Sequence, residues 1–426
     1  MTAGRTAIGL VALLVAATVS GAGQAATETP AAYAALFDQV WKTVDENFYD
    51  PTFHGLDWRA LGARYRARLG SVRDDDGFNR LANAMLDELH VSHLFLTEPS
   101  RDAAEGGVGI GVQTERFGDA RIVTEVAPLS DAQRQGLRRG DRILGASSAL
   151  YGPLGSAATL TVQGCDGARR EVSVRRESAF WPPQHPGYEW RAIAVTPKVS
   201  LGYIRIDRFD DGAAELADQA MAELKDTQGI VIDVRGGGGG NLSSLRLVSY
   251  FAGPSKPAVA LLAKPYLQAL GHPVTKADVA RLQPTRGAYT NAAIFAAIKQ
   301  GQGAAIYYTD DVGAKRYRGK VVVVMGKDTG SAGEGFAAEM RMLAAATLIG
   351  RPTAGYLLSS DRFPLAGGWT LTIPVDGVWA PDGSDFRDTP TLPDVTVART
   401  AADLCRADDP DLARAEQVLL DELEAS

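Results

Sequence analysis

Ser331 is the residue best placed to do chemistry, because it stands where a predicted strand gives way to a predicted helix. Val321 to Met325 are apolar and mostly β-branched, which favours a buried strand. A short polar turn leads to Ser331, and Phe336 to Ala346 has the composition and apolar spacing of a helix. The start of a helix suits a nucleophile, since backbone N–H groups there can hold the oxyanion that its attack creates.

The same four residues, Ser331-Ala-Gly-Glu334, also fit a purely structural interpretation. Ser-x-x-Glu is the pattern of a capping box, in which the two side chains satisfy backbone N–H groups at the helix start. Spacing alone does not separate capping from catalysis, so further residues are needed.

A possible base occurs early in the chain, in Glu88-Leu-His-Val-Ser-His93. His93 follows a predicted helix and precedes the strand-like run Leu94 to Thr97, with Ser92 directly before it. Histidine can take a proton from a serine at neutral pH, although a histidine in such a place is often a capping residue. His90 is a rival candidate three residues earlier.

A glycine run follows another core strand, in Asp233-Val-Arg-Gly-Gly-Gly-Gly-Gly-Asn241. Five consecutive glycines are conformationally costly unless the backbone must approach something closely. Phosphate binding is one explanation, but the Gly-Lys-Ser/Thr ending of a phosphate loop is missing. An oxyanion hole built from glycine N–H groups is the other.

The elements around these motifs predict an α/β protein. Residues 30–96 have helical spacing, with an Asp within 74–76 able to cap the helix that follows. Residues 203–209, 213–224 and 229–234 predict strand, helix and strand, which implies a right-handed crossover in a largely parallel sheet. Residues 178–194 have the composition of a connector, and residues 254–304 that of an insertion able to wall a cleft.

Residues 106–177 resemble a PDZ domain. Gly136-Leu-Arg-Arg-Gly-Asp-Arg-Ile-Leu144 matches the GL-x-x-GD-x-I hallmark of bacterial PDZ domains, and the Gly-rich turn Val108-Gly-Ile-Gly111 resembles the loop that receives a peptide's terminal carboxylate. The resemblance implies peptide capture by strand addition at Val108, Gly109, Ile110 and Gly111. A small β-domain with a closed groove is the alternative.

Three separated motifs together resemble the C-terminal processing and tricorn-core serine peptidase family. Asp233 to Gly240 is similar to its DLRGNGGG signature, and Thr329-Gly-Ser-Ala-Gly-Glu334 to its T-x-SA-x-E nucleophile motif. Ile349-Gly-Arg-Pro-Thr-Ala-Gly355 is similar to the G-x-x-T-x-G element that follows. The resemblance spans roughly residues 86–397.

The resemblance implies roles for individual residues. Ser331 is the expected nucleophile, and the N–H groups of Ala332 and of Gly238 or the neighbouring Gly239 form the expected oxyanion hole. Tail-specific members of the family use a lysine directly after the T-x-G element, and Tyr356 stands at that position here. Lys327 precedes the serine and has the pattern of a surface turn residue.

Tricorn-core members instead use a histidine preceded by serine, which Ser92-His93 matches. His93 is then the base and Ser92 relays orientation from an acid. The acid is where the sequence departs from the pattern, because Arg387 occupies the expected position of a glutamate. We expect the neighbouring Asp388 to take this part, with Asp385 as the nearby alternative. Gly237 also replaces the asparagine of the glycine-loop signature.

The remaining features concern the location of the protein, its cysteines and its net charge. Residues 1–25 have the layout of a secretory signal peptide, with cleavage after Ala25 or Ala26. Cys165 and Cys405 are the two cysteines, with no His or acid at metal-ligand spacing, so the sequence predicts no zinc site and leaves their pairing open. A net charge of −7 gives no sign of a nucleic-acid partner.

We therefore expect a periplasmic or secreted serine endopeptidase that acts on protein or peptide substrates and requires no cofactor. The expected core is crotonase-like (ClpP-like), with a helical N-terminal domain and a PDZ domain. A non-catalytic peptide- or lipid-binding protein on the same scaffold is the alternative. The expected parts are a signal peptide (1–25), an N-terminal helical domain (26–100), a PDZ domain (101–178), a peptidase core (179–400) and a C-terminal helix (401–426).

Overall fold

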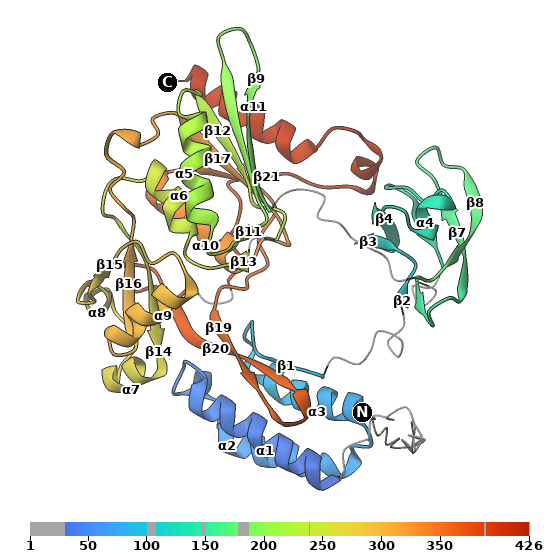
Figure 1. The fold of residues 1–426 in the computed structure, drawn as a ribbon, viewed down its shortest axis with the longest axis vertical. Coiled ribbons are helices and arrows are strands. Elements are labelled where there is room, and N and C mark those ends of the chain that lie inside the picture. The colour runs from blue at the N-terminus through green and yellow to red at the C-terminus, as the bar shows by residue number, and fades with distance from the viewer. Residues whose placement is uncertain are drawn as a thin grey trace, which may run out of the picture.

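The computed structural model describes residues 30–99, 108–145, 150–177, 187–237, 239–386 and 389–425. Figure 1 shows how the elements built from these residues are arranged. The expected signal peptide lies outside the described residues, as do Gly238, Arg387 and Asp388.

The chain begins with three helices, as the apolar spacing predicts: α1 (Pro30–Asn47), α2 (Trp58–Arg66) and α3 (Asp75–Leu86). The side chain of Asp74 caps α3 by accepting a hydrogen bond from Gly77 N, which confirms the expected cap. A 3₁₀ turn, η3 (Asp87–Leu89), then leads through His93 into strand β1 (Phe95–Thr97). The helices and their connections share one core with the sheet that β1 joins.

Residues 108–175 form a separate β-rich unit, hereafter the five-stranded unit. Its strands pair in the order β3, β4, β5, β7 and β8, and β3 and β8 are its edges. A short helix, α4 (Asp131–Arg134), packs on it, and the unit has its own apolar core. The strands are β3 (Val112–Phe117), β4 (Ala120–Val126), β5 (Arg142–Leu144), β7 (Ala157–Gln163) and β8 (Arg169–Arg175), with β2 (Val108–Gly109) paired to β6 (Tyr151–Gly152).

A six-stranded sheet carries the strand that precedes Ser331. It is parallel from β10 through β12, β17 and β18 to β21, as the strand–helix–strand order predicts, with β9 antiparallel at one edge. The expected connector is wrong for residues 188–194, which instead form this edge strand. The strands are β9 (Tyr188–Ala194), β10 (Ser200–Ile206), β12 (Gly229–Asp233), β17 (Lys320–Met325), β18 (Thr347–Gly350) and β21 (Val395–Thr396).

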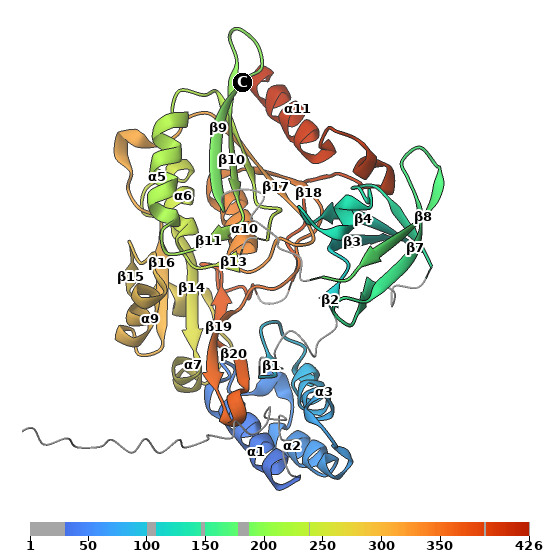
Figure 2. The same cartoon turned by 45° about the vertical axis from the view of Figure 1, so that its right-hand side comes forward.

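Both faces of this sheet are covered, which explains the unbroken apolar run of β17. Val321, Val323 and Met325 pack into a core with helices α5 (Ala213–Leu224), α6 (Ser244–Phe251) and α10 (Ala332–Ala344). The alternate residues Val322 and Val324 pack on the opposite face against α11 (Pro410–Glu424). Figure 2 shows α11 and α5 on either side of these strands.

A second six-stranded sheet lies between the first one and the N-terminal helices (Figure 1). The segment 254–304, expected as an insertion able to wall a cleft, supplies strands of this sheet. One of them, β14 (Pro257–Ala263), pairs directly with β20 (Thr370–Trp379), which follows Ser331 in the chain. The strands added to β1 are β14 (Pro257–Ala263), β15 (Pro284–Thr285), β16 (Ala304–Tyr308), β19 (Ser359–Pro364) and β20 (Thr370–Trp379), and the segment's helices are α7 (Lys264–Leu270), α8 (Lys276–Ala280) and α9 (Asn291–Gln300).

The five-stranded unit is joined to the rest of the molecule by a disulfide between Cys165 and Cys405. This resolves the pairing that the sequence left open. Glu115, on the edge strand β3, also lies 3.2 Å from Arg399 and 3.7 Å from Lys327. Figure 2 shows the unit beside the segment that precedes α11.

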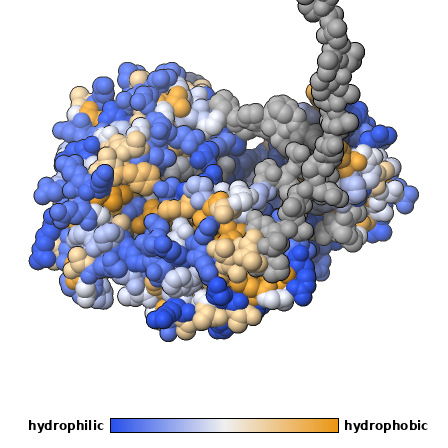
Figure 3. All heavy atoms as spheres, turned by 60° about the horizontal axis from the view of Figure 1, so that its bottom comes forward, coloured by the Kyte–Doolittle hydropathy of each residue, from blue (hydrophilic) through white to orange (hydrophobic). Residues whose placement is uncertain are grey.

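In the described part of the chain, no helix combines the length and the apolar character needed to cross a bilayer. Figure 3 brings forward the side that carries the N-terminal helices and shows hydrophilic side chains interrupted by smaller hydrophobic areas.

Candidate active site

Ser331 lies at a sharp corner between β17 and α10. Its backbone has φ 51° and ψ −125°, and a positive φ is strained for a residue with a side chain. The corner is held by hydrogen bonds from Ser331 N to Tyr356 O at 2.7 Å and from Gly330 N to Gly237 O at 3.1 Å. A strained strand-to-helix turn that presents a serine is a common device for exposing a nucleophile.

The capping-box alternative is wrong. The Ser331 side chain makes no capping hydrogen bond to α10, so its hydroxyl is not used to begin the helix. The carboxylate of Glu334 instead accepts hydrogen bonds from the backbone N–H groups of Tyr356 at 2.9 Å and Thr391 at 3.1 Å, and from the Thr353 hydroxyl. Burial raises the pKa of Glu334, and these hydrogen bonds oppose the shift. Glu334 therefore fixes two loops beside Ser331.

His93 is carried to the site by the turn between η3 and β1. The pairing of Phe95 with Thr372 anchors β1 to β20, and His93 itself has a positive φ of 59°. The Ser92 hydroxyl lies 2.9 Å from His93 Nδ1. Because Nδ1 faces Ser92, Nε2 is the ring nitrogen suited to exchange a proton with a second group.

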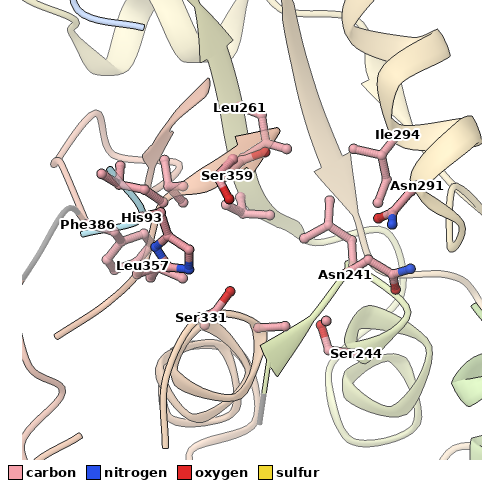
Figure 4. Close-up of a pocket in the computed structure, with 18 of the residues that line it drawn as sticks. His93, Asn241, Ser244, Leu261, Asn291, Ile294, Ser331, Leu357, Ser359 and Phe386 are labelled. Carbon is pink, nitrogen blue, oxygen red and sulfur yellow. The ribbon is translucent and has the colours of Figure 1, made fainter. Parts of the chain in front are cut away.

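Ser331 and His93 line one cavity of about 350 Å³ between the two sheets. In Figure 4 the His93 imidazole is directed toward the Ser331 hydroxyl, although the two residues are 238 positions apart (331 − 93). His90 is exposed and does not line the cavity. Much of the remaining wall is apolar and comes from β14, α9, the 357–358 loop and β20: Val259, Leu261, Ile294, Phe295, Leu357, Leu358 and Val378.

No lysine is among the described residues that line this cavity. Tyr356, which occupies the lysine position of the tail-specific members, is 59% exposed. The Lys327 ammonium is on the surface, within 3.7 Å of Glu115 and 3.1 Å of Asp328. His93, by contrast, lines the cavity together with Ser331.

The glycine run approaches the nucleophile corner from β12. Gly240 has φ 136°, and a Cβ there would come within 2.2 Å of Phe209 O, so the close packing of β13 (Gly239–Gly240) on β11 (Arg208–Phe209) requires glycine. Ala332 N is the first amide of α10 and has no carbonyl partner in the preceding turn. The N–H group of Ala332 is therefore a backbone hydrogen-bond donor directly beside Ser331. Gly239 belongs to β13, and Gly238 lies outside the described residues.

The sequence predicts Asp388 as the acid that orients His93. Asp388 lies outside the described residues. Asp385 forms an isolated bridge with Trp379, and the next residue, Phe386, lines the cavity. The described part of this segment, up to Phe386, therefore reaches the cavity.

The expected peptide-binding residues Val108, Gly109, Ile110 and Gly111 lie in the five-stranded unit and do not line the cavity. Ile110 N donates a hydrogen bond to Leu150 O at 3.1 Å, and Gly111 has φ 77°. The structure thus brings the serine and histidine together and leaves this loop in a separate unit.

Sequence reasoning missed Glu339, which lines the cavity and is 3% exposed. Its position in the sequence offered a signal, because Ser331, Gly335 and Glu339 are spaced four apart and so share one helix face. Within the described ranges, no group of three or more His, Cys, Asp or Glu side chains is arranged to hold a metal ion.

Comparison with known protein families agrees with this site. Residues 200–397, which include the glycine run and Ser331, match the model of peptidase family S41. Residues 29–87 match the tricorn protease C1 domain. The chain belongs to peptidase family S41. The family consists of serine-type peptidases. The tricorn C1 match covers residues that precede the motifs identified in the sequence.

Named S41 relatives fall on both branches of the family. The chain is 25% identical to tricorn protease homolog 2 of Streptomyces coelicolor over 92% of its own length and 32% of that protein. It is 25% identical to the chloroplastic C-terminal processing peptidase of Tetradesmus obliquus, over 84% of this chain and 76% of that one. The chain thus spans about a third of the first relative and three quarters of the second.

Solved structures share the mixed α/β fold of this S41 member. Mature CPAF superimposes with a TM-score of 0.63 at 12% identity, covering 92% of this chain and 98% of that one. The photosystem II D1 C-terminal processing protease gives a TM-score of 0.50 at 21% identity, covering 91% and 97%. At these identities the likeness concerns the fold alone.

Proposed function

We propose that this S41 member is a serine endopeptidase that uses Ser331 as nucleophile and His93 as base. The observation that carries the proposal is the shared cavity in which the imidazole is directed toward the hydroxyl (Figure 4). A serine hydroxyl is a poor nucleophile until a base removes its proton, and His93 is the titratable base beside it.

The reaction then proceeds through an acyl-enzyme. Ser331 Oγ attacks the scissile carbonyl while His93 Nε2 takes the hydroxyl proton. The amide of Ala332 and an amide of the glycine loop, at Gly238 or Gly239, stabilise the oxyanion. His93 then gives the proton to the leaving amine as the C–N bond breaks, which leaves the acyl group on Ser331 Oγ. A water molecule next attacks the acyl carbonyl while His93 takes its proton, and the proton passes to Ser331 Oγ as the ester bond breaks and the new carboxylate leaves. Ser92 orients the imidazole, and Asp388 is the acid assigned to this relay.

The five-stranded unit acts in this proposal as a PDZ domain that captures a substrate tail. Its edge strand β3 follows directly after the Val108–Gly111 loop, and a peptide can add to such an edge by backbone hydrogen bonds. The contacts of Glu115 with Lys327 and Arg399 support communication between this edge and the nucleophile turn. A crotonase-like core completes the architecture.

The proposed location is the periplasm or the exterior. The signal-like residues 1–25 and the Cys165–Cys405 disulfide both support it, because structural disulfides form mainly in oxidising compartments.

A fluorophosphonate probe tests the catalytic proposal, since it reacts with activated serines. We expect labelling of the folded protein that is lost in Ser331→Ala and slowed by about a thousandfold in His93→Ala. His90→Ala is the matched control and should label like the wild type. A folded wild type that stays unlabelled, or a His93→Ala variant that labels at the normal rate, contradicts the proposal.

A further inference from the structure

Glu339 is a buried acid that the proposed reaction does not use. It is 3% exposed, and its Oε2 atom is shielded from solvent with no hydrogen-bond partner in the described part of the protein. Glu339 is nevertheless one of the residues that line the Ser331 cavity. An unpaired buried acid is costly to stability, so a site that retains one calls for an explanation in terms of a ligand.

The position of Glu339 relative to the nucleophile follows from helix geometry. Ser331 at the start of α10, Gly335 and Glu339 are each one turn apart and line the same cavity. The Cα atoms of Ser331 and Glu339 are therefore separated by about 12 Å along the axis, and helical side chains lean toward the N-terminus, so the carboxyl group leans back toward Ser331. Gly335 has no side chain to block the face between them.

The walls of the cavity match a long side chain with an apolar stem. Leu261, Leu357 and Val378 are among the apolar residues that line it. Lysine and arginine pack their methylene stems on such surfaces and place the charge at the tip. A short substrate side chain cannot span the two helical turns between Ser331 and Glu339. A long apolar substrate side chain leaves the carboxyl group of Glu339 unpaired.

Two other charged residues line the cavity, Asp361 and Arg362, and both are exposed on β19, whereas Glu339 is buried. Burial alone raises the pKa of Glu339 to about 8, with no basic group of the described protein acting against the shift. Glu339 is therefore largely protonated in the empty cavity, and an entering cation favours its ionised form.

From this geometry we infer that Glu339 is the specificity determinant for a lysine or arginine side chain on the residue whose carbonyl Ser331 attacks. The inference rests on the proposed function and adds the class of substrate: polypeptides cleaved after a basic residue. Ionised Glu339 pairs with the ammonium or guanidinium group at the floor of the cavity, where exclusion of water strengthens the pair.

The test uses three peptides that differ at one position, which carries lysine, arginine or norleucine, the last having a chain similar to lysine without the charge. We expect the wild type to cleave the lysine and arginine peptides at least about tenfold more efficiently in kcat/KM than the norleucine peptide. Glu339→Gln should bring that ratio close to one by lowering kcat/KM for the lysine and arginine peptides. Equal cleavage of the three peptides by the wild type, or an unchanged ratio in Glu339→Gln, overturns the inference.

A binding arm separates this inference from the catalytic proposal. In the Ser331→Ala background, calorimetry should show the lysine peptide binding at least about tenfold tighter than the norleucine peptide, with the difference lost on adding Glu339→Gln. Equal binding overturns the inference even where the fluorophosphonate probe labels wild-type Ser331 normally. Conversely, absent labelling overturns the peptidase proposal, while the binding difference still decides whether Glu339 recognises a cation.

Two variants guard against trivial explanations. Glu215→Gln removes a carboxylate from the exposed face of α5, far from the cavity lining, and should leave every ratio unchanged. Glu339→Met fills the same space without a polar group and should abolish the preference for basic residues with no loss of thermal stability. Retention of the preference in Glu339→Met overturns the inference.

Discussion

The Ser92 hydroxyl lies 2.9 Å from His93 Nδ1, so the residue directly before the imidazole also sets its orientation. Local contacts of this kind select the ring tautomer and direct the other nitrogen toward its partner. We predict that Ser92→Ala lowers kcat/KM by roughly ten- to a hundredfold, less than His93→Ala, because the base remains but is less well oriented. Peptide hydrolysis and the rate of fluorophosphonate labelling measure the effect.

Ser92→Thr keeps the hydroxyl and is the matched control for this prediction. It should recover most of the activity. If Ser92→Ala is as active as the wild type, orientation of His93 must come from another group.

The identity of the orienting acid is decided by comparing two carboxylates three positions apart in the sequence, Asp385 and Asp388. We predict that Asp388→Asn lowers kcat/KM by about a hundredfold, because it removes the charge that stabilises the imidazolium. Asp385, which bridges to Trp379, should tolerate the change to Asn with less than about a threefold loss. Steady-state kinetics on the two variants measures kcat/KM. A larger loss in Asp385→Asn than in Asp388→Asn would make Asp385 the orienting acid.

Glu334 should be important for stability as well as for the site. Glu334→Ala leaves the N–H groups of Tyr356 and Thr391 without their acceptor, and we expect a loss of about 3 kcal/mol in the free energy of unfolding. Urea denaturation measures this loss. Labelling of Ser331 should also slow, because Tyr356 O accepts the hydrogen bond from Ser331 N. Glu334→Gln retains one acceptor oxygen and should lose less, and a Glu334→Ala protein of normal stability would contradict this role.

The Cys165–Cys405 disulfide closes a loop with a sequence separation of 240 residues. Its removal in a Cys165→Ser, Cys405→Ser double variant should lower stability by on the order of 3 kcal/mol, because the unfolded chain gains freedom. The melting temperature is the measurement. Since neither cysteine lines the cavity, hydrolysis of a short peptide should be nearly unaffected below the melting range. Unchanged melting in the oxidised and reduced wild type would contradict the expectation.

Glu339 gives stability a distinct dependence on pH. Burial raises its pKa from 4.5 to about 8. Between these values the folded protein holds a proton that the unfolded chain has released, so the free energy of unfolding falls as pH rises through this window. Glu339→Gln lacks this contribution. We predict that it becomes more stable than the wild type by on the order of a few kcal/mol between about pH 5 and about pH 8.

Urea denaturation at several pH values measures this difference. Burial also raises the pKa of Asp376, to about 6, with an effect of the same sign, but this residue is present in both proteins and cancels in the comparison. If the difference in the free energy of unfolding between the wild type and Glu339→Gln does not grow with pH, Glu339 is already ionised and paired.

Local patterns in the sequence were enough to identify the chemistry-bearing segments. The β-branched run of β17, the serine before α10 and the Ser92-His93 pair depend on neighbours a few residues away, so periodicity and turn chemistry reveal them. The same reasoning failed for β14 and β16. Short apolar runs such as 257–263 and 304–308 do not distinguish a sheet strand from other buried segments until their partners are known.

The sequence by itself therefore determined the serine peptidase motifs, the largely parallel character of the main sheet and the choice of histidine over lysine as the expected base. Only the tertiary structure brought the turn before β1 against the start of α10, paired Cys165 with Cys405, and enclosed Glu339 in the wall of the same cavity. The reason is physical: strand and helix formation is governed by short-range spacing. Which side chains share a cavity depends on pairings between strands hundreds of residues apart, which no local pattern encodes.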